Sequence, residues 1–329
     1  MDAIRTIGVI GGGAWGTALA NAAASSGKAV ALWMRDKDAA AEAELSRTNT
    51  RYLPGVRLLD PVGVTSRPQT LAAAETVLLV VPTQSLRAAL ATFADVLPAG
   101  TPMVLCAKGI ERGTNLFPTE IVRELRPQAP VAVLSGPSFA ADVARGLPTA
   151  VALAAEDGDF ARQLAADLSG PALRVYHGTD VRGAEIGGAA KNVLAIGVGI
   201  VDGRGLGDSA KAALTARGFA ELLRFAQAYG ARPQTLMGLS GLGDLVLTCG
   251  SAQSRNFSLG LRIGAGAPLA EAAGGKLAEG AFTADALVAL ARGRDVEMPI
   301  AEAVAAVLAG TLTVDAAVEG LMARPLRAE

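Results

Sequence analysis

The stretch EIGGAAKNVLAIG (185–197) places one lysine, Lys191, inside an apolar, glycine-rich run. An unpaired ammonium is costly to bury, so Lys191 is either a snorkelling surface residue or a group with a chemical role. If the stretch is helical, its neighbours at helical spacing are nearly all glycine, alanine or valine. A snorkelling lysine would predict further charges on that face, whereas a bare face lets another surface or a ligand approach. We therefore favour an acid–base role for Lys191, with Asn192 as a polar neighbour on the adjoining face.

The scarcity of other candidate groups supports this interpretation. His177 is the one histidine in the chain, so histidine-based triads and multi-histidine metal sites cannot be built from it. An acid or base must then be Lys, Asp, Glu, Tyr or Cys. Cys106 and Cys249 lie in separate apolar contexts without CxxC spacing. We expect neither a disulfide nor a metal site, and a reducing compartment fits this cysteine usage.

Two later stretches carry polar groups suited to a phosphorylated ligand. In SAQSRNFSLG, the donors Ser254, Arg255 and Asn256 stand where the chain enters a predicted helix. A guanidinium and neighbouring N–H groups match a phosphate dianion, although an exposed arginine beside a helix cap is the alternative. In GLSGLGDLVLTC, Asp244 follows a glycine-rich turn. It is either a helix cap or the partner of a buried lysine, and the sequence does not choose between them.

Two turns in the first half of the chain also offer donors. In VAVLSGPSFAADVA, Pro137 suits the first position of a helix that Ser135 or Ser138 could cap, with Gly136 between them. Such a turn at the end of a strand exposes donors where parallel sheets bind ligands, although a simple helix cap is equally consistent. Lys108, in LCAKGIE, follows another strand on the same expected edge. It is either a ligand contact or a solvated lysine.

A glycine motif stands at the start of the chain. IGVIGGGAWGTALA contains G-x-G-x-x-G as Gly11, Gly13 and Gly16, between a first strand and a helix. The first glycine permits the tight turn, the second lets the backbone approach a pyrophosphate, and the third lets helix and strand pack closely. The helix N-terminus offers N–H groups to the phosphates. The motif therefore predicts dinucleotide binding rather than an empty glycine turn.

The end of the second strand bears on which dinucleotide binds. It reads WMRDKD, with Arg35 before Asp36 and Lys37 after it. An acid there takes the ribose hydroxyls of NAD, whereas an arginine suits the extra phosphate of NADP. The residues leave both NADP and NAD open, with NADPH favoured because of Arg35. A plain surface charge cluster is the alternative.

These groups require a scaffold, and hydrophobic periodicity indicates an α/β fold. Strands are predicted at 6–11, 29–34, 75–82, 102–109, 131–136, 149–155 and 172–178. Helices are predicted between most of them, including 84–97, 117–126 and 158–169. Continuous apolar strands alternating with helices favour a Rossmann-like, doubly wound, mostly parallel sheet covered on both faces. Beyond this region only helical, alanine-rich segments follow. We expect a dinucleotide-binding domain at 1–186 and an all-helical substrate-binding domain at 187–329.

Composition excludes several function classes. The chain has 329 residues, of which 51% are hydrophobic, and its formal net charge is −1. Without a basic block, nucleic-acid binding is not expected. The first residues, MDAIRTIGVIGGG, indicate a strand and turn rather than a signal peptide. No uninterrupted apolar stretch approaches the roughly 20 residues of a membrane span. We expect a cytoplasmic protein without a membrane span.

Taken together, these segments resemble the bacterial NAD(P)-dependent glycerol-3-phosphate dehydrogenase family. The similarity runs through nearly the whole chain in order and spacing. Its motifs are GGGAWGTALA, VPTQSLR, AKGIE, LSGPSFA, EIGGAAKNVLAIG, DGRGLGDSAKAAL, GLSGLGDLVLTC, SRNFSLG and AEG. The resemblance implies that dihydroxyacetone phosphate is reduced to sn-glycerol 3-phosphate for phospholipid synthesis, and it is compatible with a homodimer.

The resemblance also implies roles for individual residues. Lys191 would be the proton donor in reduction and the acceptor in oxidation, with Asp244 or Asn192 orienting or charge-balancing it. The implied contacts to the dinucleotide are Trp15, Arg35, Lys108, Ala140, Arg255, Leu277 and Glu279. The implied contacts to the triose phosphate are Lys108, Gly136, Ser138, Lys191, Asp244, Ser254, Arg255 and Asn256.

Two other functions are consistent with parts of the sequence. A ketopantoate or 3-hydroxyacid reductase also pairs a Rossmann domain with a helical one and uses a lysine. Such an enzyme has less need for phosphate donors at 254–256. A non-catalytic dinucleotide sensor would keep the glycine turn but has no reason to carry Lys191, Asp244 and Arg255. The dehydrogenase therefore accounts for more of the sequence than either alternative.

Overall fold

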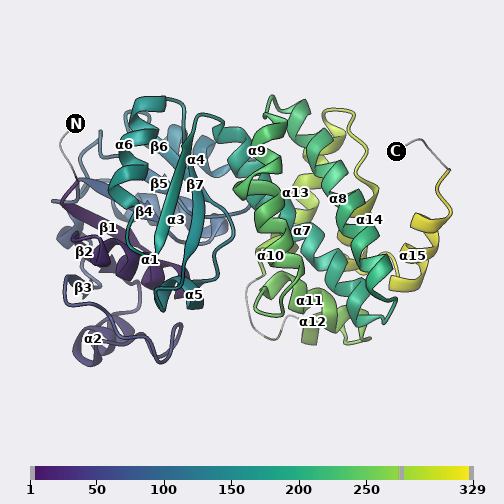
Figure 1. The fold of residues 1–329 in the computed structure, drawn as a ribbon, viewed down its shortest axis with the longest axis horizontal. Helices are drawn as coiled ribbons and strands as arrows, with labels where there is room; N and C mark the ends of the chain where they lie inside the picture. Colours follow the sequence, from purple (N-terminus) through teal and green to yellow (C-terminus); the bar gives the residue numbers. More distant parts are fainter. Residues whose placement is uncertain (1–3, 273, 275–277, 326–329) are drawn as a thin grey trace. The chain divides into compact units, whose positions relative to one another are not determined.

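The computed structural model describes residues 4–272, 274 and 278–325, and its contacts divide the chain into two compact units (Figure 1). One unit comprises the chain up to Lys108 together with Leu116–Glu185. The other comprises Gly109–Asn115 and the chain from Ile186 onward. The boundary falls within helix α7 (Val181–Gly203), and the short segment after Lys108 belongs with the second unit.

The first unit is built on one eight-stranded sheet in the order β3-β2-β1-β4-β5-β6-β7-β8. Its strands are β1 (Thr6–Ile10), β2 (Ala29–Trp33), β3 (Val62–Thr65), β4 (Thr76–Leu79), β5 (Met103–Leu105), β6 (Val131–Ser135), β7 (Thr149–Ala155) and β8 (Leu173–Gly178). All neighbouring strands are parallel except β6 and β7. The predicted mostly parallel α/β sheet is confirmed. The sequence missed β3, whose four residues, VGVT, are too few to show a period.

Both faces of this sheet are covered, as a doubly wound sheet requires. Along β4, Val77 and Leu79 belong to one hydrophobic core and Leu78 to the other, because successive side chains point to opposite faces. Helices α1 (Ala14–Ser25) and α6 (Gly158–Leu168) supply residues to the core with Leu78. Helices α3 (Leu86–Thr92) and α4 (Pro118–Leu125) supply residues to the other core. The remaining helical elements of this unit are α2 (Lys37–Ser46), η1 (Pro68–Leu71), η2 (Thr83–Ser85) and α5 (Ala140–Ala144).

The strand order creates one topological switch point. Strand β1 lies between β2 and β4. The chain adds β2 and β3 on one side of β1 and then crosses over to add β4 to β8 on the other side. In open sheets of this kind, ligands bind beyond the carboxyl ends of the strands at such a point. Because β1 to β6 are parallel, the turns that follow them lie at the same edge of the sheet.

The second unit is helical throughout the residues that the structure describes. After α7 its elements are α8 (Asp208–Ala228), α9 (Pro233–Met237), the π-helical turn η3 (Leu239–Gly243), α10 (Asp244–Cys249), α11 (Arg255–Gly264), α12 (Leu269–Ala272), α13 (Glu279–Arg292), α14 (Pro299–Leu308) and α15 (Val314–Met322). The predicted all-helical second half of the chain is confirmed.

The sequence predicts no apolar stretch long enough to span a membrane, but helix α7 is such a stretch by its length and composition. It has 23 residues, with a mean hydropathy of 1.4 over its most apolar part, so length and composition alone would permit a span. That part is 100% buried inside the protein. The helix is apolar because it forms the core of the fold.

Glycines on α7 and α11 let these two helices pack backbone against backbone. A Cβ at Gly199 would lie 2.2 Å from Phe257 O, and one at Gly203 would lie 2.0 Å from Leu261 O. From the other side, a Cβ at Gly260 would lie 2.0 Å from Ile196 O. Any side chain at these positions would force the helices apart. The bare face predicted for α7 is therefore occupied here by a neighbouring helix.

Candidate active site

The glycine-rich turn follows β1 at the switch point. Gly11 has φ +120°, and a Cβ there would lie 2.6 Å from Val80 O. A Cβ at Gly16 would lie 1.8 Å from Gly11 O, so the helix meets the turn at a distance only glycine allows. At Gly13, by contrast, a Cβ would meet no atom of the described residues within 4 Å, its two chain neighbours aside.

This turn has the environment that a pyrophosphate needs. Gly13 precedes the first residue of α1, where no side chain caps the helix N-terminus. The N–H groups of the first turn lie at the positive end of the helix dipole, which favours an anion. Trp15 lies in this first turn and packs partly against the hydrophobic core. The arrangement fits a dinucleotide, and the chemistry such a group supplies when bound is hydride transfer.

Arg35 and Asp36 follow the end of β2, at the same edge of the sheet as the glycine turn. Backbone pairing of Gly11 N–H with Trp33 O fixes this end beside the glycine turn. Arg35 is exposed, whereas Asp36 is the N-cap of α2 and accepts hydrogen bonds from the N–H groups of Asp38 and Ala39. Sequence alone did not show that Asp36 is used as a cap.

The turns after β5 and β6 meet around one carbonyl oxygen. Lys108 Nζ donates to Gly136 O at 3.0 Å, and Ser138 Oγ donates to the same oxygen at 3.0 Å. Gly136 has φ +140°, and a Cβ there would lie 3.0 Å from Val151 Cα. The structure thus brings Lys108, Gly136 and Ser138 together.

The helix predicted to begin at Pro137 starts later. Helix α5 begins at Ala140, its N-cap is Phe139, and no side chain caps it. The prediction that Ser135 or Ser138 caps this helix is wrong. The left-handed backbone at Gly136 keeps the following residues in a turn, so the Ser138 hydroxyl bonds back to Gly136 instead.

In the second unit, Lys191 is buried and paired. Its side chain is 7% exposed, and Nζ donates to Asp244 Oδ1 at 2.5 Å and to Thr248 Oγ1 at 2.7 Å. Asp244 is the first residue of α10, and its side chain is 2% exposed. Thr248 follows one turn later on the same helix, so both acceptors face Lys191. Lys191 is therefore not a snorkelling residue, and Asp244 is its ion-pair partner.

A glycine one helical turn before Lys191 makes this pairing possible. A Cβ at Gly187, one turn earlier on α7, would lie 2.3 Å from Ser240 O in η3. Because Gly187 has no side chain, η3 can approach α7 closely. Since α10 follows η3 directly, this approach brings Asp244 and Thr248 to Lys191. Sequence reasoning missed Thr248, which carries no signal beyond its spacing of four residues from Asp244.

A second polar cluster joins three helices around the residue that follows Lys191. Asn256 Nδ2 donates to Asn192 Oδ1 at 2.9 Å, and Gly280 N donates to Asn256 Oδ1 at 2.9 Å. A Cβ at Gly280 would lie 2.5 Å from Asn192 O, so only glycine fits there. These bonds join α7, α11 and α13. Glu279, the residue before Gly280, is the first residue of α13.

The three predicted phosphate donors have different surroundings. Ser254 is the N-cap of α11, and its Oγ accepts from Phe257 N at 3.2 Å. Asn256 is buried in the cluster with Asn192, whereas Arg255 is exposed at the first position of α11. Of the three side chains, only that of Arg255 projects into solvent. Leu277, predicted to contact the dinucleotide, lies outside the described residues.

The cysteine next to this site is chemically inert. Burial raises the pKa of the Cys249 thiol to about 12 and keeps it protonated at neutral pH. Among the described residues, no group of three or more His, Cys, Asp or Glu side chains could hold a metal ion. Cys249 therefore offers no thiolate to this site.

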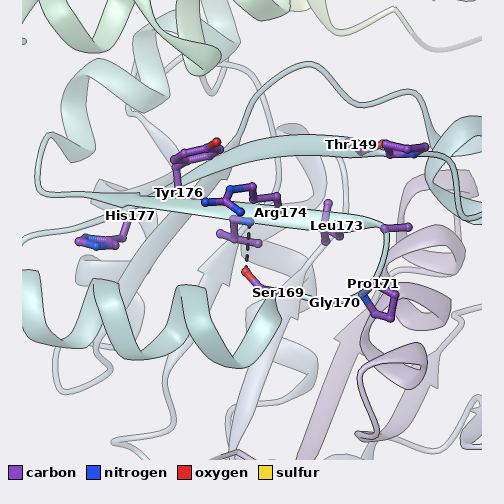
Figure 2. A pocket seen from close by; sticks show the side chains of 11 residues that line it. Thr149, Ser169, Gly170, Pro171, Leu173, Arg174, Tyr176 and His177 are labelled. Carbon is purple, nitrogen blue, oxygen red and sulfur yellow. Dashed lines mark hydrogen bonds between the residues drawn. The ribbon is translucent and has the colours of Figure 1, made fainter.

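A large surface hollow of the first unit is lined by none of these residues. It has a volume of about 620 Å³ and flanks the edge strand β8, with Thr149, Arg174, Tyr176 and His177 among its lining residues (Figure 2). Ser169 Oγ accepts from the N–H of Val175 there, as the dashed line in Figure 2 shows. This bond covers part of the open strand edge. No predicted site residue lines the hollow.

Comparison with known proteins places these features in a family. Residues 6–161 match the family model described as the N-terminus of NAD-dependent glycerol-3-phosphate dehydrogenase, and residues 180–319 match the model of its C-terminus. A protein of Methylobacterium radiotolerans named glycerol-3-phosphate dehydrogenase (NAD(P)+) is 61% identical, covering 100% of this chain and 99% of that protein. A protein of the same name from Azorhizobium caulinodans is 62% identical, covering 100% of both. A crystal structure of glycerol-3-phosphate dehydrogenase from Coxiella burnetii matches with a TM-score of 0.92 at 38% identity, covering 98% of this chain and 99% of that one.

Proposed function

The chain belongs to the NAD-dependent glycerol-3-phosphate dehydrogenase family, and we propose that Lys191 is the proton donor with which it reduces dihydroxyacetone phosphate to sn-glycerol 3-phosphate. The enzyme is an NAD(P)-dependent oxidoreductase. The observation that carries the proposal is the buried Lys191 side chain, held by Asp244 and Thr248. The product supplies the backbone for phospholipid synthesis.

The pairing of Lys191 explains how it can serve as an acid. During reduction the ketone carbon gains a hydride and negative charge develops on the carbonyl oxygen. Lys191 donates a hydrogen bond to that oxygen and then its proton, a contribution worth about 10²–10⁴-fold in rate. In glycerol 3-phosphate oxidation the same nitrogen accepts the proton.

The neighbours of Lys191 fix its charge and its direction. The Asp244 carboxylate stabilises the ammonium form in a site that excludes most water. Thr248 Oγ1 accepts a second hydrogen bond from the ammonium and so helps to fix its direction. We assign Asp244 and Thr248 the role of positioning residues. Asn192 supports the same stretch of α7 through Asn256.

Arg255 is the group best suited to hold the substrate phosphate. Its guanidinium is exposed at the N-terminal end of α11, where the helix dipole also favours an anion. Binding the phosphate away from the reacting carbon lets binding energy position that carbon. The buried Ser254 and Asn256 support this turn. Substrate contacts by Lys108, Gly136 and Ser138 remain predictions.

For the cofactor, we assign the pyrophosphate to the turn at Gly11, Gly13 and Gly16, and the adenosine ribose to the region of Arg35. The open space at Gly13 and the uncapped start of α1 support the first assignment. The exposed Arg35 favours NADPH over NADH. Contacts by Trp15, Lys108, Ala140, Arg255 and Glu279 are part of the same proposal.

A direct assay tests the function. Purified protein with NADPH or NADH and dihydroxyacetone phosphate should consume the reduced cofactor, as followed by its absorbance, and form sn-glycerol 3-phosphate. Unphosphorylated dihydroxyacetone and ketopantoate should be turned over far more slowly. Absence of turnover with either cofactor would contradict the dehydrogenase function, and faster turnover of ketopantoate would favour the ketoacid reductases.

Two further properties belong to this proposal. We place the enzyme in the cytoplasm, because its substrate and reduced cofactor are cytoplasmic metabolites, and the family is compatible with a homodimer. Cell fractionation and light scattering of the purified protein would check the two statements separately.

A further inference from the structure

We propose that Arg51 recognises the 2′-phosphate of NADP(H) and so determines which of the two dinucleotides this enzyme prefers. The inference rests on the proposed dinucleotide site at the glycine turn. It concerns a loop, residues 47–58, that no sequence motif connects with the cofactor. Three observations within the first unit carry it.

The first observation is that the loop is anchored to the glycine turn. The Asn49 side chain is buried, and its Nδ2 donates to Gly12 O at 2.8 Å and to Thr17 Oγ1 at 2.8 Å. Asn49 O in turn accepts from the N–H of Leu53 at 2.8 Å, which closes a tight turn around the residues between them. Arg51 lies within this turn. Its backbone is therefore held beside the turn that receives the pyrophosphate.

The second observation is that the Arg51 side chain reaches the end of β2. Its Nη1 lies 3.3 Å from Asp36 Oδ2, and its guanidinium lies over the ring of Tyr52, 5.3 Å from the ring centroid. In a dinucleotide-binding sheet, the residue at the end of the second strand faces the adenosine ribose. Arg51 thus places a cation at the position where the 2′-substituent is recognised, next to Arg35.

The third observation is that Asp36 is already engaged. Its Oδ1 accepts from the N–H groups of Asp38 and Ala39 as the cap of α2, and Oδ2 faces Arg51. An acid that selects NAD must offer its carboxylate to the ribose hydroxyls. Here both carboxylate oxygens have partners in the protein. The acid at the end of β2 therefore serves as the cap of α2, and Arg51 is the partner of its second oxygen.

These contacts predict a preference for the phosphorylated cofactor. The Arg51 and Asp36 side chains are 63% and 52% exposed, so their ion pair is weak and easily exchanged. A 2′-phosphate carries more charge than a carboxylate and accepts the guanidinium fork in two parallel hydrogen bonds. The 2′-phosphate of NADP(H) can replace Asp36 as the partner of Arg51. NAD(H) has no phosphate at this position and gains no affinity from Arg51.

Equilibrium titrations of the purified chain with NADPH, NADH, adenosine 2′,5′-bisphosphate and AMP test this inference without catalysis. For Arg51→Gln we expect affinity for NADPH and for the bisphosphate to fall about tenfold, with NADH and AMP changed less than about twofold. Arg51→Lys should retain part of the preference. Asp36→Asn keeps a good N-cap but removes the competing charge, so it should bind NADPH more tightly and NADH unchanged.

Arg57→Gln is the matched control, because Arg57 lies on the same loop and its exposed side chain pairs only loosely with Asp60, at 3.5 Å. It should leave all four affinities unchanged. Equal losses for NADPH and NADH in Arg51→Gln, or no loss for either, would overturn the role of Arg51. If wild type binds none of the four compounds, the dinucleotide site itself is wrong. Binding without turnover would count only against the dehydrogenase function.

Discussion

Lys191 Nζ lies 2.5 Å from Asp244 Oδ1, although 53 positions of sequence separate the two residues. The pair is almost completely buried, and Thr248 adds a second acceptor for the ammonium. A buried charge of this kind is stable only while its partner remains, because an unpaired charge would lose its hydration without compensation. The same pairing holds the nitrogen in one place, which an acid–base catalyst requires.

Replacing Lys191 with methionine should reduce kcat by roughly 10²–10⁴-fold, because the carbonyl oxygen loses its proton donor. Lys191 is not among the proposed dinucleotide contacts, so affinity for NADPH should be unchanged. Steady-state kinetics and a cofactor titration measure the two quantities. Lys211→Met is a matched control, since Lys211 pairs with Asp202 in the same unit and should not affect kcat. Near-normal turnover of Lys191→Met would remove Lys191 from the reaction.

Thr248→Val should lower kcat by about tenfold with little change in KM, because the ammonium of Lys191 loses one fixed acceptor while the shape of the side chain is kept. Thr248→Ser restores the hydroxyl and should restore kcat. A threonine that acted only through packing would behave differently, since serine would then be the worse replacement. Kinetics of both variants at saturating cofactor distinguish the two cases.

Arg255→Ala should raise KM for dihydroxyacetone phosphate by at least about tenfold, because a charge-assisted contact to the phosphate is lost. At saturating cofactor, the slow turnover of unphosphorylated dihydroxyacetone by this variant should not change. Arg292→Ala, at an exposed arginine paired with Glu302, serves as the control. An unchanged KM for the phosphorylated substrate would argue against phosphate binding by Arg255.

Gly199→Ala should destabilise the protein by about 1–3 kcal/mol or more, because the added Cβ would lie 2.2 Å from the backbone oxygen of Phe257. Gly320→Ala in α15 is the opposite case. Apart from the backbone of its own helix, no atom of the described residues lies within 4 Å of a Cβ there, so alanine should be neutral or stabilise by up to about 1 kcal/mol. Denaturant unfolding of both variants measures the difference. Equal effects would mean that α7 and α11 can separate at little cost.

Glu221 should make stability depend on pH. Burial raises its pKa to about 7, against the hydrogen bonds that its carboxylate accepts from the N–H groups of Ile300 and Ala301. Because the folded-state pKa lies above the unfolded value, the protonated form is favoured by folding. This stabilisation is complete below about pH 4 and is lost as pH rises toward 7.

The free energy of unfolding of wild type relative to Glu221→Gln should therefore fall by about 1–3 kcal/mol between pH 4.5 and pH 8. Glu185, whose pKa burial also raises to about 7, is present in both proteins and cancels in this difference. Urea unfolding across this pH range makes the measurement. A difference that rises with pH would show that the carboxylate is the form favoured by folding.

Local sequence determined much of this protein. The turn at Gly11, Gly13 and Gly16 could be predicted because its conformation depends on a few adjacent residues and on the absence of Cβ atoms. Seven strands and the change to helices after them followed from apolar periodicity. Lys191 stood out because a charge in an apolar run needs a physical reason.

Only the tertiary structure decided which groups meet. The choice of Asp244 as partner of Lys191 depends on Gly187 admitting η3, and the choice of Thr248 follows from the direction of α10. Asn49 anchors the glycine turn from 37 positions away, and Asp36 proves to be a helix cap. These relationships join residues far apart in sequence. No local pattern records them, because they arise when burial of apolar faces brings separate helices and loops together.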